Sequence, residues 1–220
     1  KNPNEIAGDG IDNDNNGSAV DGYGLNALNA SGDPFDDNGH GTHCAGTIGA
    51  AANNGFDHVG VAWSTQLMAL KFLDADGFGS LSGAMACIEY AIANGADIIN
   101  ASYGGGGFSQ AMADLIAAAG ESGVLFVAAA GNESNNNDTN PSYPASYSAT
   151  NVISVAAINR SDLIAGFSNF GVYAVDLAAP GVDIFSAIAD SDSSYGFYSG
   201  TSMAAPHVSG GIALLADYFG

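Results

Sequence analysis

The chain has 220 residues, of which 47% are hydrophobic and 31 are glycine, so it can bury one core and its composition excludes a disordered chain. Its net charge of -20 at pH 7 leaves only Lys1, Lys71 and Arg160 as basic residues, which excludes nucleic acid as a partner because phosphates could not be neutralised. The chain has no apolar run of about 18 residues, so we expect no membrane span and no membrane partner.

The first segment, residues 1–37, is polar, rich in Gly, Asn and Asp, and almost without periodicity. Within it, alternate acidic and amide side chains followed by glycine in residues 12–17 are typical of the opening of a calcium loop. Tyr23 stands where an EF-hand needs a bidentate glutamate, which argues against an EF-hand. We predict a structural calcium site, against the alternative of a solvated, turn-rich loop. Its candidate ligands are Asp9, Asp12, Asp14, Asn16 and Asp21.

After residue 40 the pattern becomes a regular alternation of helices and strands. The expected helices cover residues 40–52, 82–94 and 109–119, and the expected strands cover residues 66–73, 97–102, 124–130, 152–158, 175–179 and 182–187. This alternation predicts one α/β domain over residues 1–220, with a mostly parallel central sheet between helices on both faces. Ligands of such sheets bind beyond the carboxyl ends of the strands, where Ser102 and Asn132 are expected.

Two motifs carry the chemistry. Ser202 lies among small residues at the start of an apolar helical run, in Gly-Thr-Ser-Met-Ala-Ala-Pro-His, with Pro206 expected in the first helical turn. Helix N-terminal N–H groups can stabilise an oxyanion there, but a serine nucleophile also needs a base. His40 can supply it, in Asn-Gly-His-Gly-Thr-His-Cys-Ala-Gly-Thr. Taken singly, the motifs are equally consistent with a capped helix start and a surface histidine.

Taken together, these motifs resemble those of the subtilisin-like serine peptidases, and the resemblance extends over roughly residues 2–218. A third motif between them, Ala-Ala-Ala-Gly-Asn ending at Asn132, is similar to the strand end that carries the oxyanion-hole asparagine of that family. The resemblance implies a three-layer subtilisin-like fold and a secreted serine endopeptidase that cleaves peptide or protein substrates through an acyl-enzyme. Ser202 would be the nucleophile, His40 the general base, and Asn132 the oxyanion donor, although Gly131-Asn132 alone could be an ordinary turn.

The same resemblance indicates where a peptide would bind. The Gly-Phe-Gly and Ser-Tyr-Gly segments resemble the two extended segments that hold a peptide as an added strand, beside a broad pocket for uncharged side chains. Residues 140–144 resemble the segment that closes the pocket, which makes Tyr143-Pro144 a candidate cis bond. The predicted substrate-binding residues are Gly77, Phe78, Gly79, Ser102, Tyr103, Gly104, Ala129, Ala130 and Gly131.

The chain departs from the family pattern at the acid that orients the histidine. In the family this acid ends an early apolar strand before Asp-Thr-Gly or Asp-Ser-Gly, and no such run occurs here. Asp36 and Asp37 precede His40 too closely and would shape the loop, and Asp97 belongs to the wrong end of the sheet, so no acid is assigned. We therefore expect the chain to lack that strand and the C-terminal end of the domain. Because it begins with Lys1 and has no visible signal peptide, we expect a processed part of a longer, secreted precursor.

Other protein classes fit these residues less well. A catalytically silent, calcium-stabilised binding or scaffold module would keep the motifs without the acid. A zinc pair from His40 and His43 lacks an accompanying carboxylate, so His43 and His207 are expected to be structural. An α/β-hydrolase needs a histidine well after the serine, a chymotrypsin-like barrel should be all-β, and Cys44 lacks the surroundings of an activated nucleophile. Cys44 instead matches the free cysteine of proteinase-K-like members, and Cys87 is expected to be buried and unpaired. The sequence predicts no oligomeric state.

Overall fold

The computed structural model describes residues 22–219, and these residues form two compact units. The first unit contains residues 22–39 and 67–96, and the second contains residues 40–66 and 97–219. Each unit is built around its own strands. The prediction of one domain over residues 1–220 therefore stays a prediction.

The first unit combines a small parallel sheet with one helix. Its elements are β1 (Gly24–Asn26), β2 (Ala69–Lys71) and α2 (Leu81–Ala93). The side chain of Ser80 accepts a hydrogen bond from the N–H of Gly83 and thereby caps the start of α2. Leu25, Cys87 and Tyr90 form the buried centre of this unit.

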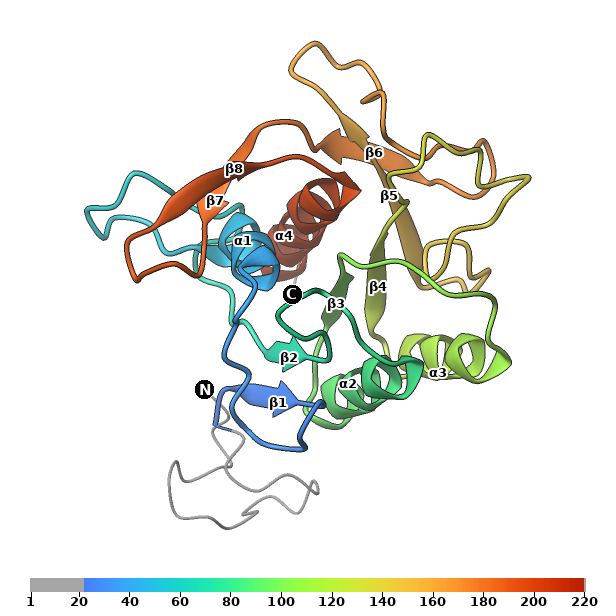
Figure 1. The fold of residues 1–220 in the computed structure, drawn as a ribbon, viewed down its shortest axis with the longest axis horizontal. Helices are drawn as coiled ribbons and strands as arrows, with labels where there is room; N and C mark the ends of the chain where they lie inside the picture. The colour runs from blue at the N-terminus through green and yellow to red at the C-terminus, as the bar shows by residue number, and fades with distance from the viewer. Residues whose placement is uncertain (1–21, 220) are drawn as a thin grey trace. The chain divides into compact units, whose positions relative to one another are not determined.

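The second unit is organised around a parallel sheet with the strand order β3-β4-β5-β6. Its strands are β3 (Ile98–Ala101), β4 (Leu125–Ala129), β5 (Val152–Ile158) and β6 (Leu177–Pro180). Its helices are α1 (His40–Gly49), α3 (Gln110–Glu121) and α4 (Thr201–Phe219), and an antiparallel pair is formed by β7 (Ile184–Ala187) and β8 (Tyr195–Tyr198). Figure 1 shows α4 along one face of the sheet and α3 on the other, so this unit confirms the predicted three-layer α/β architecture.

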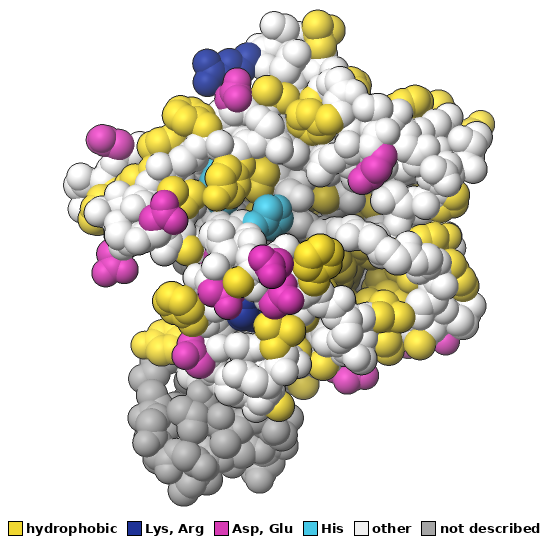
Figure 2. Space-filling model, viewed as in Figure 1, with side chains coloured by type: hydrophobic (Ala, Val, Ile, Leu, Met, Phe, Trp, Pro, Cys, Tyr) yellow, Lys and Arg dark blue, Asp and Glu magenta, His cyan; other side chains and the backbone are white. Residues whose placement is uncertain are grey.

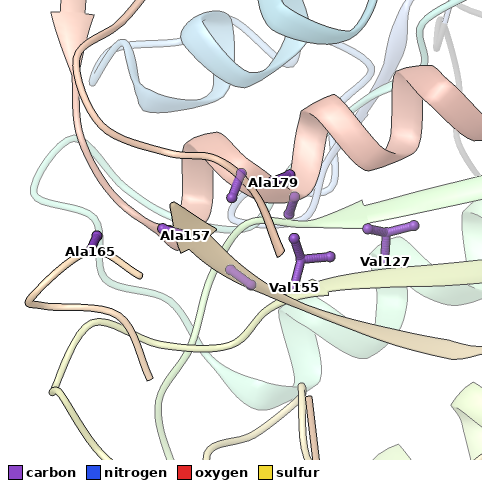
Figure 3. Close-up of a cluster of buried hydrophobic side chains, with 8 residues drawn as sticks. Val127, Val155, Ala157, Ala165 and Ala179 are labelled. Carbon is purple, nitrogen blue, oxygen red and sulfur yellow. The ribbon is translucent and has the colours of Figure 1, made fainter. Parts of the chain in front are cut away.

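One hydrophobic core of the second unit lies between α4 and the sheet. Figure 3 shows the side chains of Val127, Val155 and Ala179 converging from neighbouring strands. Ala204 and Ala205 of α4, both 0% exposed, pack against them. Small side chains on the helix let its backbone approach the sheet closely, which gives the start of α4 a fixed position above the strand ends.

Farther along α4, Gly210 provides a second close approach. A Cβ atom at Gly210 would lie 2.7 Å from the Cβ atom of Val61, in the segment that follows α1. A Cβ atom at the next residue, Gly211, would meet nothing within 4 Å. The first glycine is therefore required by packing, whereas the second is not.

Some predicted boundaries were wrong. Helix α1 ends at Gly49 rather than near residue 52, because the returning chain donates from Val61 N–H to Thr47 O and from Ala62 N–H to Ile48 O, which occupies the last-turn carbonyls. Strand β2 is three residues long rather than eight. Strands β1 and β8 were not predicted, whereas β5 has the predicted bounds.

Among the charged side chains of the surface, acidic ones predominate. Figure 2 shows acidic side chains spread over the visible face, with few basic ones between them. Within residues 22–219, none of the helices combines the length and apolar character needed to cross a bilayer.

Candidate active site

Ser202 is the second residue of α4, directly after the turn that leaves β8. Its hydroxyl donates a hydrogen bond of 3.2 Å to the carbonyl oxygen of Ser102, at the end of β3. Its backbone N–H belongs to the first turn, where helix N–H groups have no intrahelical acceptor, and it has no partner in the described part of the chain. Ser202 thus presents a hydroxyl and a free N–H donor together.

Pro206 occupies the sixth position of α4, not the first turn as predicted. Because proline has no N–H, the carbonyl oxygen of Ser202 four residues earlier loses its helical partner. Two side chains take that place: Ser102 Oγ donates to it at 2.8 Å, and Cys44 Sγ donates at 3.3 Å. The proline therefore frees a carbonyl through which β3 and α1 hold the backbone of Ser202.

His40 is the first residue of α1, and Cys44 lies one turn later on the same helix. The Sγ atom of Cys44 is 3.9 Å from Nδ1 of His40 and also contacts the Ser202 carbonyl, so Cys44 bridges the two motif residues. The structure thus brings the histidine and serine motifs together from positions 162 residues apart (202 − 40). Hydrogen bonds between such groups often tighten only when substrate is bound.

Asn132 follows β4, and its side-chain oxygen is fixed by Thr201 of α4. Its Oδ1 atom accepts from the Thr201 N–H at 2.8 Å and from Thr201 Oγ1 at 3.0 Å. Thr201 Oγ1 in turn accepts from the Gly131 N–H at 3.2 Å. Since two donors face Oδ1, the opposite atom of the amide is the Nδ2 donor, and it has no partner among residues 22–219. Asn132 and Ser202 therefore offer two uncommitted N–H donors.

Both residues line one cavity of about 380 Å³ in the second unit. Its walls are mostly glycine, amide and hydroxyl groups, and they also include the ring residue Tyr143 and the carboxylate residue Glu133. The lining is formed by Tyr103, Gly104, Gly105, Gly106, Ala129, Gly131, Asn132, Glu133, Asn135, Asn140, Pro141, Ser142, Tyr143, Thr201 and Ser202. The cavity is wide enough for one side chain of a peptide and is edged by the serine hydroxyl.

The predicted substrate-binding residues of the second unit lie in or next to the cavity. Tyr103, Gly104, Ala129 and Gly131 line the cavity. Ser102 lies beneath Ser202 as its hydrogen-bond partner, and Ala130 is fully buried. The peptide bond between Tyr143 and Pro144 is cis, which confirms that expectation.

Gly77, Phe78 and Gly79 belong to the first unit, where they form a tight turn after β2. The carboxylate of Asp74 accepts hydrogen bonds from the N–H groups of Asp76 and Phe78, and the ring of Phe78 is 74% exposed. Their predicted contact with substrate stays a prediction.

The carboxylates considered as orienting acids occupy three different settings. Asp36 accepts from the backbone N–H groups of Asn38 and Gly39, as expected for a loop-shaping residue. Asp37 pairs with Lys71. The backbone of Asp97 leads into the amino end of β3, opposite to the end where Ser102 lies. The predicted calcium ligands lie outside the described residues, and residues 22–219 contain no cluster of three His, Cys, Asp or Glu side chains that could hold a metal.

Of the remaining histidines in the two motifs, His43 is buried and His207 is partly buried. His43 is 0% exposed, stacks on Tyr198, and donates from Nε2 to the Ile184 carbonyl at 3.0 Å. Its Nδ1 has no partner within the described chain, and burial lowers the pKa of its ring. Burial likewise lowers the pKa of His207, whose Nδ1 donates to the Met203 carbonyl at 2.8 Å. Both have the structural setting that was expected.

Both cysteines are buried and neither forms a disulfide, as predicted. Burial raises the pKa of the Cys87 thiol to about 12, which keeps it protonated and unreactive.

Sequence reasoning did not single out Thr201 or Glu133. Thr201 was inside the quoted serine motif, and a hydroxyl residue at a helix start is a typical hydrogen-bonding position. Glu133 carried no local signal, because its place on the cavity wall depends on the path of the chain after β4.

A family model described as the subtilase family matches residues 6–220. The chain belongs to the subtilase family. It is 42% identical over 204 residues to a "Thermophilic serine proteinase" from Bacillus sp. (strain AK1), covering 93% of this chain and 48% of that protein. It is 46% identical over 184 residues to "Subtilisin NAT" from Bacillus subtilis subsp. natto, covering 83% of this chain and 47% of that protein.

A solved structure agrees with the fold. The crystal structure of a cold adapted subtilisin-like serine proteinase matches with a TM-score of 0.79 at 35% identity, over 92% of this chain and 68% of that one. The chain spans about half the length of the curated relatives it matches. The subtilase fold predicted from the motifs is thereby confirmed.

Proposed function

We propose that this subtilase chain is the catalytic part of a secreted serine endopeptidase that hydrolyses peptide bonds through an acyl-enzyme. The observation that carries the proposal is the convergence on one cavity of the Ser202 hydroxyl with two N–H donors, from Ser202 and Asn132, that have no partner among residues 22–219. An acyl-transfer site needs this combination, because negative charge develops on the carbonyl oxygen during attack.

In the proposed reaction, Ser202 Oγ attacks the carbonyl carbon of the scissile bond while His40 takes the hydroxyl proton. The oxyanion that forms accepts hydrogen bonds from the Ser202 N–H and from Asn132 Nδ2. His40 then gives its proton to the departing amine as the C–N bond breaks. A water molecule, deprotonated by His40, then attacks the acyl carbon; the bond from that carbon to Ser202 Oγ breaks, and His40 returns its proton to Oγ. No orienting acid is assigned to His40 among the described residues.

We further propose a broad first pocket that favours uncharged side chains. The cavity walls offer glycine backbone, amide and hydroxyl groups and the ring of Tyr143, none of which imposes a specific charge. Glu133 on the same wall disfavours an acidic side chain by like-charge repulsion. Neutral aromatic and aliphatic residues should therefore be cleaved faster than aspartate or glutamate.

The deciding experiment is hydrolysis of chromogenic peptides that differ only in the residue before the scissile bond, with a Ser202→Ala variant beside the unchanged chain. We expect turnover with Phe or Leu, much less with Glu, and none above background in the variant. In subtilisin itself, loss of the nucleophile costs about 10⁶-fold in kcat, which sets the scale. Equal inactivity of the two proteins would contradict the proposal.

A fluorophosphonate probe gives an independent measurement, because it reacts only with an activated serine hydroxyl. Labelling of the unchanged chain and not of Ser202→Ala supports a peptidase. Absence of labelling in both would favour a catalytically silent binding or scaffold module.

We also propose a structural calcium ion in the acidic N-terminal segment. The candidate ligands Asp9, Asp12, Asp14, Asn16 and Asp21 offer the oxygen donors that calcium prefers. The calcium would restrain that segment and take no part in the chemistry.

A further inference from the structure

The buried side chain of Asn169 holds the loop after β4 through hydrogen bonds to its backbone. This residue follows β5 in the chain and is 0% exposed. Its Oδ1 accepts from the N–H of Glu133 at 2.9 Å and from the N–H of Asn135 at 3.0 Å. Its own N–H donates to the Gly131 carbonyl at 2.9 Å. These three bonds fix the backbone on both sides of Asn132.

The amide nitrogen of Asn169 completes the arrangement. Nδ2 lies 2.7 Å from Glu133 Oε2, 3.1 Å from the Ala130 carbonyl and 3.1 Å from Asn137 Oδ1, all of which are acceptors. Asn137, 1% exposed, also donates to the Ala130 carbonyl at 2.8 Å. Asn169 thus touches the segment from Ala130 to Asn137 with both ends of one amide.

Only an amide satisfies this site. A carboxylate would keep the acceptor for the two N–H groups but would set an oxygen against Glu133 Oε2 and the Ala130 carbonyl. A smaller side chain would leave buried N–H groups unpaired, which favours a different path for the loop. The fit is tight as well: Gly131 has φ +112, and a Cβ there would collide with the Asn169 amide nitrogen.

We propose that Asn169 is a positioning residue for catalysis: it sets the loop so that the amide of Asn132 and the carboxylate of Glu133 keep their places on the cavity wall. The inference rests on the proposed function. Thr201 orients the Asn132 side chain by donating to its Oδ1 atom. Asn169 fixes the backbone that follows Asn132 by accepting from the N–H groups of Glu133 and Asn135. A shift of the loop would misplace the oxyanion donor without removing any group from the cavity.

The test is a double-mutant cycle with Asn169→Ala and Asn132→Ala, measured with the peptide cleaved fastest. Asn169→Ala is expected to lower kcat by about 10- to 100-fold while KM changes less than about threefold, because misplacement weakens transition-state binding more than substrate binding. In the Asn132→Ala background the same change is expected to cost little more, since the donor that it positions is already absent.

Asn151→Ala is the matched control. Asn151 is another buried asparagine, 7% exposed, whose Nδ2 donates to the carbonyls of Ile116 and Val124 near the amino end of β4, away from the cavity. It should lower the unfolding midpoint and leave kcat unchanged. If Asn169→Ala does not accumulate in folded form, Asn169→Asp serves instead: it keeps an oxygen for both N–H groups and replaces the donor by an oxygen that faces Glu133 Oε2 and the Ala130 carbonyl, so the loop should again shift.

The outcomes separate the two proposals. An unchanged chain without Ser202-dependent turnover overturns the proposed function and this inference with it. An active chain in which the two losses in kcat multiply, or in which Asn169→Ala behaves like Asn151→Ala, overturns the inference alone.

Discussion

Thr201 shows how a single buried hydroxyl can serve a site without touching substrate. Its Oγ1 donates to Asn132 and accepts from Gly131 in a fully buried position. Thr201→Val keeps the volume and removes both bonds, so kcat is expected to fall about tenfold with little change in KM, a fraction of the 10² to 10³ lost when subtilisin lacks an oxyanion donor. Steady-state kinetics checks this.

The control for that substitution is Thr47→Val in α1. Thr47 is 4% exposed, and its hydroxyl donates to the His43 carbonyl one turn earlier. The same atoms are removed there without contact to Asn132, so the variant should retain its kcat. An equal loss in both variants would assign the effect to general destabilisation.

Asp138 organises a second loop through charge. Its carboxylate accepts from the N–H groups of Val172, Tyr173 and Ala174 at 2.7, 3.0 and 2.8 Å. These bonds, led by that from Val172, lower the pKa of Asp138. A lowered pKa means that the folded state releases the proton more readily than the unfolded state. The contribution to stability is therefore complete above the unfolded pKa and is lost as the pH falls through the folded pKa.

Asp138→Asn tests this linkage. Urea unfolding from about pH 7 down to about pH 2 should show the largest difference between the two proteins at neutral pH and a shrinking difference below about pH 4, the unfolded pKa of aspartate. A difference that stays constant over the whole range would show that the carboxylate charge plays no part.

Among the elements, α4 depends most on small residues. Gly210→Ala would place a Cβ 2.7 Å from the Cβ of Val61, whereas Gly211→Ala meets open space in the same helix. We expect the first to destabilise by about 1–3 kcal/mol through overpacking, and the second to stabilise by up to about 1 kcal/mol because alanine favours a helix over glycine. Urea denaturation of the pair checks the prediction, and changes of the same sign would contradict it.

The elements also show what a sequence can and cannot predict here. Strand β5 was predicted with its observed bounds, because a continuous apolar run fits a strand buried on both faces. Strand β1 was missed because three residues carry too little pattern and owe their conformation to pairing with β2, 45 positions later (69 − 24). Pro206 was predicted in the first turn because local preference does not register that the Ser202 carbonyl, which Pro206 leaves without a helical N–H donor, accepts from Ser102 and Cys44 instead.

The site divides in the same way. Ser202, His40 and Asn132 stand in long motifs that can be read directly from the sequence. Asn169 does not, because its partners lie more than 30 positions away and only the folded sheet brings them together. The supporting residues of the site are thus specified by topology more than by local sequence.

For the whole molecule, the net charge of -20 makes cations a general stabilising influence, which must be separated from a specific calcium site. At equal ionic strength, we expect calcium to raise the thermal midpoint well above the value in sodium. When the calcium concentration is 100 times its Kd, binding stabilises the folded state by about 2.7 kcal/mol. Sodium acts only by screening. Asp12→Ala should abolish the calcium increment, and identical curves for the two salts would contradict the site.

The two buried thiols can report the opening of the two units separately. Cys87 lies in the core of the first unit and Cys44 in the second, and both are shielded from solvent. An alkylating reagent reaches each sulfur only when its own unit opens, so the order in which the two become labelled reports which half of the chain opens first. The protein thus carries, without any introduced cysteine, a separate reporter for the opening of each unit.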